Sequence, residues 1–245
     1  MIIDGHVRIG SSFNKTGLSI DEYVSHMESN NITKAVICPN KPISYLVEDG
    51  NALIAEICQK DPDKFIGAIR LDPWRLEASI GEIEKYSNIM DKFLYLNPFE
   101  ELFQCNDEIL NPLLEMAEKL NYIVIVETGY PWHSHITQVV DIARRFPNLK
   151  FFATNAGQLD LSASTLDDVA VAMDKTPNLY LGTASACGAE WIKNIADKYP
   201  SRVYFESNFP MMDPYLEIFR VTEGFFTKEQ QEDVLYNNMN TLINK

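Results

Sequence analysis

Residues 1–10 read MIIDGHVRIG, a short apolar run that passes into the polar residues Asp4, His6 and Arg8. Nearly continuous apolar runs are typical of strands buried on both faces of a parallel sheet. A second histidine at position 8 would complete an H-x-H pattern suited to a metal at the end of a barrel strand, but arginine cannot ligate a metal. The stretch therefore predicts a buried strand whose end carries polar side chains.

Seven similar runs follow, and amphipathic segments separate them. The eight expected strands are Ile2–Val7, Ala35–Cys38, Phe65–Leu71, Lys92–Leu96, Tyr122–Glu127, Lys150–Thr154, Leu179–Gly182 and Arg202–Glu206. The expected helical segments are the stretch after Ser19, which has capping-box spacing to Glu22, and Pro112–Leu120, Ile136–Phe146, Val169–Met173, Trp191–Ile195 and Glu229–Ile243. This alternation predicts an α/β fold of the (β/α)8 TIM-barrel type. An open doubly wound sheet is the alternative, but no G-x-G-x-x-G turn follows the first strand.

The composition narrows the function classes. Hydrophobic residues make up 46% of the 245 residues, and the net charge of -14 comes without a basic cluster, which argues against a nucleic-acid partner. No linker, repeat or low-complexity stretch interrupts the chain, so we expect one domain over residues 1–245. The first residues lack the basic and long apolar regions of a signal peptide, and no apolar run approaches membrane-spanning length. We therefore expect a cytoplasmic protein without membrane contact, and its four cysteines, which form no C-x-x-C pair, as reduced thiols.

Polar residues stand at most of the expected strand ends, where the active sites of TIM barrels lie. They are His6, Arg8, Arg70, Asp72, Asn97, Glu127, Asn155, Thr183, Ser185, Glu206, Ser207 and Asn208. A loop with Trp132, His133 and His135 follows the fifth strand on the same side of the barrel. The sequence therefore predicts a functional site where these side chains converge.

In chain order, these strand ends resemble the amidohydrolase superfamily, specifically the amidohydrolase-2 group that includes decarboxylases and lactone hydrolases. IIDGHVRIG (2–10) falls where the family has D-x-H-x-H, and the stretch from LYLNP (94–98) to VETGYP (126–131) falls where it has a K-L-H-P turn, N-D, a helix and a strand. FPNLKFFATNAGQ (146–158) resembles the sixth strand, which normally ends in His-x-Gly. NLYLGTAS (178–185) and RVYFESNFP (202–210) resemble the last two strands, the second of which usually reads G-[ST]-D-x-P, and EDVLYNNMNTLI (232–243) resembles the closing helix. The resemblance spans essentially the whole chain and implies the same barrel.

The resemblance also implies where a metal site would lie. The family's first histidine is kept as His6, its second falls on Arg8, and its strand-five histidine falls on Glu127. The strand-six histidine falls on Asn155. The strand-eight aspartate, which is usually both ligand and general base, falls on Asn208. One member of this constellation is unchanged.

These replacements argue against the family's metal. A catalytic zinc site needs about three His, Cys or carboxylate ligands and an open position, and here only His6 and Glu127 qualify. The strand-four Lys and His of the family fall on Tyr95 and Asn97, which supply no such ligand. A guanidinium ~4 Å from a dication at an effective dielectric of ~20 repels it by roughly 8 kcal/mol, so Arg8 disfavours a metal as well. We therefore expect no metal and no other cofactor.

Arg8 is the expected replacement for the missing cation. Its planar donor fork suits a carboxylate or a developing oxyanion, and we expect it to pair with Glu127. The expected catalytic residues are His6, Arg8, Glu127 and Asn208, of which Glu127 or His6 would move the proton because the amide of Asn208 does not titrate usefully. The expected substrate-binding residues are Asn97, Arg70, Asn155, Trp132 and His133.

Three hypotheses follow for the function. The first is an amidohydrolase-fold enzyme that works without the usual metal, in hydrolysis or related acyl or carboxyl chemistry on a small polar substrate bearing a carboxylate or carbonyl. The second is a catalytically inactive barrel that binds a small molecule or a partner, because the carboxylate base and most ligand positions are lost. A rebuilt metal site made of His6, Glu127 and a loop histidine is the third. A homodimer is conceivable because of the aromatic loops.

Overall fold

The computed structural model describes residues 1–157 and 163–244. Gln158, the last residue of the strand-six motif, lies outside the described residues. Eight parallel strands follow one another around the sheet in chain order, and these strands are β1 (Ile2–Ile9), β2 (Ile32–Pro39), β3 (Phe65–Arg70), β4 (Phe93–Leu96), β5 (Ile123–Val126), β6 (Lys150–Ala153), β7 (Leu179–Gly182) and β8 (Val203–Tyr204).

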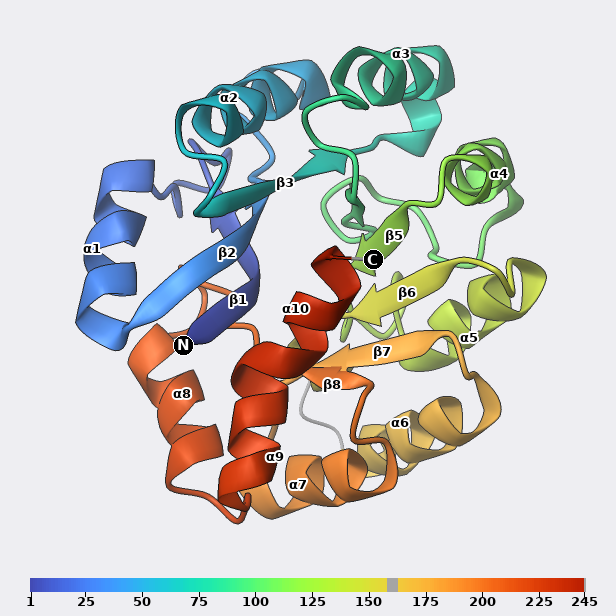
Figure 1. Cartoon of the computed structure of the whole chain (residues 1–245). Coiled ribbons are helices and arrows are strands. Elements are labelled where there is room, and N and C mark those ends of the chain that lie inside the picture. The colour runs from blue at the N-terminus through green and yellow to red at the C-terminus, as the bar shows by residue number, and fades with distance from the viewer. Residues whose placement is uncertain (158–162, 245) are drawn as a thin grey trace.

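Backbone hydrogen bonds bring the first and last strands of the sheet together. The N–H of Gly5 donates to the carbonyl of Phe205 at 2.9 Å, and the N–H of Arg8 donates to the carbonyl of Phe209 at 2.9 Å. The sheet therefore wraps round on itself, and the predicted TIM-barrel fold is confirmed (Figure 1).

Helices surround the strands in the order that the alternation predicts (Figure 1). They are α1 (Ile20–Asn30), α2 (Val47–Lys60), α3 (Leu76–Tyr86), α4 (Asn111–Lys119), α5 (Ile136–Arg145), α6 (Ala163–Lys175), α7 (Ala189–Lys198), α8 (Pro214–Thr222), α9 (Lys228–Glu232), a π-helical turn (Asp233–Asn237) and α10 (Asn238–Ile243). The capping box before α1 is confirmed, because the Ser19 side chain accepts from the N–H of Glu22 while the Glu22 side chain accepts from the N–H of Ser19. None of the described helices is long and apolar enough to cross a membrane.

The inside of the barrel is divided into an apolar end and a polar end. At the N-terminal ends of the strands, the buried side chains form an apolar cluster that includes Ile3, Phe93, Phe152, Tyr204, Met239 and Leu242. The last two of these come from α10, which lies across this end of the barrel (Figure 1). The polar side chains are left to the opposite end, where the strands finish.

Candidate functional site

His6 lies between two buried carboxylates. The pairing of β1 with β2 shifts register between Asp4 and Val7, so a bulge in β1 carries His6 into the barrel. Its Nε2 lies 3.4 Å from an oxygen of Glu127, and its Nδ1 lies 3.6 Å from an oxygen of Glu206. All three side chains are at most 1% exposed. Burial lowers the pKa of His6 to about 4, with Glu127 acting against this shift, so the imidazole is neutral at neutral pH.

Glu127, which follows β5, is held as a carboxylate. It accepts hydrogen bonds from the Tyr95 hydroxyl at 3.0 Å and from the side-chain amide of Asn155 at 3.0 Å. Burial opposes ionisation, but the charges of its neighbours and these two hydrogen bonds outweigh it, and the pKa of Glu127 lies below its ordinary value. The guanidinium of Arg8 is the permanent charge among those neighbours.

Asn155 joins the two carboxylates to each other. Its backbone N–H donates to Glu206 at 2.6 Å, while its side chain donates to Glu127. Asn155 and Asn208 both adopt left-handed backbone, with φ of 56° and 48°, a conformation that asparagine tolerates better than most residues. The Asn208 amide in turn donates to the side-chain oxygen of Asn155. Both asparagines were predicted to act in binding or catalysis. In the structure Asn155 donates to the two carboxylates, and Asn208 donates to Asn155.

Arg8 forms its ion pair with a residue that the sequence did not suggest. Its Nη1 lies 3.1 Å from Glu100, in the loop after β4, and the other oxygen of Glu100 lies 2.7 Å from Arg70. The predicted direct pairing of Arg8 with Glu127 is therefore wrong, and Glu127 acts on Arg8 over a longer distance. Burial disfavours the charge of Arg8, but Glu127 and Glu100 raise its pKa overall, so the guanidinium stays charged. Its Nε is buried without a hydrogen-bond partner in the described part of the chain.

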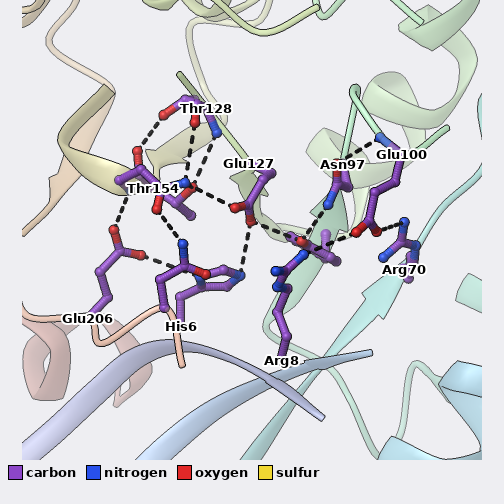
Figure 2. A network of polar contacts seen from close by, with 12 residues as sticks. His6, Arg8, Arg70, Asn97, Glu100, Glu127, Thr128, Thr154 and Glu206 are labelled. Atoms are coloured by element: carbon purple, nitrogen blue, oxygen red, sulfur yellow. Dashed lines mark hydrogen bonds and ion pairs between the residues drawn. The ribbon is translucent and has the colours of Figure 1, made fainter. Parts of the chain in front are cut away.

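Arg70 and Asn97 hold the residues around them. Arg70 is fully buried, donates to Glu100 and Glu101, and donates a further bond to a backbone carbonyl. Asn97 accepts from the backbone N–H of Glu100 at 3.0 Å and donates to the Tyr95 hydroxyl at 3.1 Å (Figure 2). The structure brings both into the cluster as predicted, where their bonds are made to protein groups.

The loop after β5 contributes a different residue from those predicted. Trp132 is 81% exposed, and His133 lies outside the buried cluster, with Nδ1 3.2 Å from the carbonyl of Phe103. Tyr130, from the same loop, stacks on Phe99 with ring centroids 4.2 Å apart and planes 5° from parallel. Burial, with Glu127 next, raises the pKa of Tyr130 above its ordinary value, which places its hydroxyl within electrostatic reach of the cluster. Tyr130 therefore connects the buried cluster to the surface.

Comparison with known proteins identifies the family of the chain. The model of the amidohydrolase family matches residues 46–239, which is more than half of the chain. The chain belongs to the amidohydrolase family. A comparison with curated proteins found no match.

Solved structures share the amidohydrolase barrel of this chain. An uncharacterised TIM-barrel protein from Bordetella bronchiseptica is 16% identical with a TM-score of 0.80, covering 99% of this chain and 98% of that chain. A 4-oxalomesaconate hydratase from Rhodopseudomonas palustris is 17% identical with a TM-score of 0.70, covering 99% and 95%. A 5-carboxyvanillate decarboxylase from Novosphingobium aromaticivorans, solved with bound manganese, is 13% identical with a TM-score of 0.76, covering 100% and 97%. At these identities the likeness shows the fold.

The donors at the strand ends of this amidohydrolase do not fit a metal ion. The two nitrogens of His6 face different carboxylates on opposite sides of the ring, so the three groups do not converge on one point. Within residues 1–157 and 163–244, no three His, Cys, Asp or Glu side chains form a group that could hold a metal. The loop histidines do not complete one, because His133 lies against the carbonyl of Phe103 and His135 caps α5. The alternative of a rebuilt metal site therefore has no donor set here.

Sequence reasoning missed one member of the cluster and gave another no role. Glu206 was noted only as a polar strand end, because the family motif has glycine at its position and draws attention to Asn208 instead. Glu100 lies in the loop after β4, and no motif or spacing marks it as the partner of Arg8. Glu127 and Glu206 were both among the expected strand-end residues, whereas the sequence did not indicate Glu100 and Glu101, which pair with Arg70.

Proposed function

We propose that this amidohydrolase performs acyl or carboxyl chemistry on a small molecule that bears a carboxylate or carbonyl, with Arg8 supplying the positive charge that a metal supplies in relatives. The observation that carries the proposal is the Arg8 guanidinium, a permanent charge at the strand ends whose buried Nε–H has no protein partner among the described residues. An unpaired buried donor costs about 1–3 kcal/mol, which a substrate oxygen can recover. The hydratase and decarboxylase among the structural neighbours act on carboxylates according to their names, which favours the same class of substrate.

Glu100 and Glu127 would have different roles beside Arg8. Glu100 fixes one edge of the guanidinium, which leaves the Nε–H to donate to a carbonyl or carboxylate oxygen. In the transition state this bond would strengthen as negative charge develops on that oxygen. Glu127 is ionised and is the group that accepts or returns a proton, with neutral His6 beside it. No step of this scheme needs a metal.

Asn208, which was predicted to be catalytic, and the predicted binding residues would act at two distances from the substrate. Asn208 has a buried side-chain oxygen without a partner in the described part of the chain, which can accept from a substrate hydroxyl. Arg70 and Asn97 would act indirectly by holding Glu100 and Tyr95. Trp132 and His133 would reach a substrate only at the mouth of the site.

The proposal is tested by screening lactones, amides and carboxylic acids with protein treated with a chelator. We expect turnover that falls at least 100-fold in Arg8→Ala and is partly kept in Arg8→Lys, because lysine retains the charge without the fork. Arg144→Ala, which changes an exposed arginine of α5, is the matched control and should have no effect. Turnover that survives in both Arg8→Ala and Glu127→Ala would show that the assignment of roles is wrong.

One observation favours the second candidate, an inactive barrel that binds a ligand or partner. The cluster is sealed, since His6, Glu127, Asn155, Glu206 and Asn208 are each at most 1% exposed. If this candidate is correct, carboxylates will raise the melting temperature of the protein without being consumed. Ligand-dependent stabilisation without turnover across the whole screen would therefore replace the first proposal by the second.

A further inference from the structure

The contact between His6 and Glu206 is unexplained by the roles given so far. Nδ1 of His6 and Oε2 of Glu206 lie 3.6 Å apart, both are buried, and neither has a hydrogen-bond partner in the described part of the chain. Two buried polar atoms without partners each cost about 1–3 kcal/mol, and a small rotation of either side chain would join them. Each is the available partner of the other.

The surrounding chain makes room for Glu206 at this place. A Cβ at Gly182, the last residue of β7, would lie 2.1 Å from Oε1 of Glu206, so only glycine fits beside the carboxyl group. The backbone N–H of Asn155 donates to the same oxygen at 2.6 Å, and the left-handed backbone of Asn155 aims it there. Two neighbouring strand ends therefore fix one oxygen of Glu206 and turn the other toward His6.

The two carboxyl groups that flank His6 differ in what stabilises a negative charge. Glu127 accepts two side-chain hydrogen bonds and lies within the field of Arg8. Among the described residues, Glu206 accepts one hydrogen bond, from the backbone N–H of Asn155, and it is fully buried, which disfavours a charge. In the trio of His6, Glu127 and Glu206, the negative charge therefore lies on Glu127, and Glu206 is the neutral acid.

We propose that Glu206 is a positioning residue that donates its proton toward Nδ1 of His6 and so fixes His6 as the tautomer with a proton on Nε2, facing Glu127. Under the proposed function, on which this part rests, the trio also stores a proton. Glu206 passes its proton to Nδ1, Nε2 passes its proton to Glu127, and Glu127 delivers that proton to the substrate. Glu206 is left as a carboxylate, His6 remains neutral, Glu127 regains its charge, and a proton from solvent restores the resting state.

The test is the tautomer of His6 in the resting protein, measured by NMR on protein labelled with 15N in its four histidines. A His6→Asn variant assigns the His6 signals. We expect one neutral form with the proton on Nε2 and an unprotonated, hydrogen-bonded Nδ1. A proton on Nδ1, or a doubly protonated ring, would overturn the proposal. This measurement needs no substrate, so its outcome is independent of the screen for turnover. The tautomer can be confirmed when no turnover is found, and turnover can be found when the tautomer is wrong.

Variants of Glu206 separate positioning from packing. Glu206→Gln keeps a donor that can reach Nδ1, so the Nε2 tautomer should persist, whereas Glu206→Leu has no donor and should give a mixture of tautomers. Glu82→Gln is the control, because Glu82 is another buried glutamate and lies on α3. Identical His6 signals in wild type and Glu206→Leu would overturn the proposal. The wild-type measurement decides the tautomer even if the leucine variant does not fold.

Discussion

Burial of His6 couples the stability of the protein to pH. The pKa of His6 is about 4 in the fold and 6.5 in the unfolded chain, so the native state excludes a proton that the unfolded state takes up. The stabilising contribution of His6 is therefore complete above about pH 6.5 and is lost as the pH falls through about 4. Its size is about 3 kcal/mol.

Asp4 has the opposite dependence in the same range. Burial raises its pKa from 3.8 to about 6, so its contribution is present at low pH and is lost as the pH rises through about 6. The two effects nearly cancel in wild type. Asparagine does not titrate, so only the effect of Asp4 remains in His6→Asn. In urea unfolding, the unfolding free energy of His6→Asn should therefore rise as the pH falls from about 6.5 to 4. The difference in unfolding free energy between wild type and His6→Asn should shrink by about 3 kcal/mol over the same range. If the difference in unfolding free energy between wild type and His6→Asn is the same at about pH 6.5 and about pH 4, His6 is not buried in its neutral form.

The close approach of Glu206 to Gly182 gives a prediction about packing. Gly182→Ala places a methyl group against Oε1 of Glu206 and should lower the unfolding free energy by about 1–3 kcal/mol. Gly81→Ala is the matched control, because no atom lies within 4 Å of a Cβ there and the site is inside α3. Alanine at that helical position should raise stability by about 0.5–1 kcal/mol. Equal effects of both changes in thermal unfolding would contradict the placement of Glu206.

At the residue scale, the sequence located the site but not its pairings. His6, Arg8 and Glu127 were predictable because each stands at the end of an apolar run. The partner of Arg8 was not, since Glu100 is 92 positions away and reaches Arg8 only through the path of the loop after β4. Such an ion pair depends on the directions of the side chains, and a pattern of apolar residues does not predict these directions.

At the scale of elements, the loop after β5 brings Tyr130 within electrostatic reach of the site. Its ends are closed by a hydrogen bond from the N–H of Gly129 to the carbonyl of Ser134 at 3.1 Å, and Gly129 has φ of 100°, a conformation suited to glycine. Tyr130 from this loop stacks on Phe99, and its hydroxyl lies within electrostatic reach of Glu127 and Arg8. We therefore expect this aromatic pair to limit access to Arg8.

Removal of the Tyr130 ring should expose Arg8 to reagents. We expect Tyr130→Ala to increase modification of Arg8 by phenylglyoxal several-fold, as measured by peptide mass spectrometry. Trp132→Ala, in the same loop but with its side chain already in solvent, should leave the modification unchanged. Protection of Arg8 that is equal in all three proteins would contradict a covering role for Tyr130.

Most elements were predictable to within a few residues, and the exceptions have physical causes. The strand expected over Arg202–Glu206 pairs with β7 only at Val203–Tyr204, because the chain then turns to bond with β1. Helices α2, α3 and α8 were not predicted. Helix α2 begins after Leu46 without a side-chain cap and contains Gly50, and both features weaken the helical signal in its sequence.

At the scale of the whole molecule, repeated alternation was enough to predict the barrel, and α10 completes it. Met239 of α10 is fully buried against the apolar layer at the N-terminal strand ends. Met239→Ala should lower the unfolding free energy by about 2–5 kcal/mol, because it removes buried apolar atoms and leaves a cavity. Met211→Ala, at a residue that is 43% exposed, should change it by less than about 0.5 kcal/mol. Equal losses in chemical denaturation would mean that α10 does not support the barrel.

Under the proposed function, the Arg8 guanidinium supplies the positive charge that a metal supplies in relatives. The most direct test is the metal content of protein purified without chelator, measured by plasma mass spectrometry on wild type and on His6→Ala. We expect far less than one zinc or manganese per chain, and no difference between the two proteins, because the donors around His6 do not converge and Arg8 repels a dication. A content near one metal per chain that is lost in His6→Ala would contradict the claim.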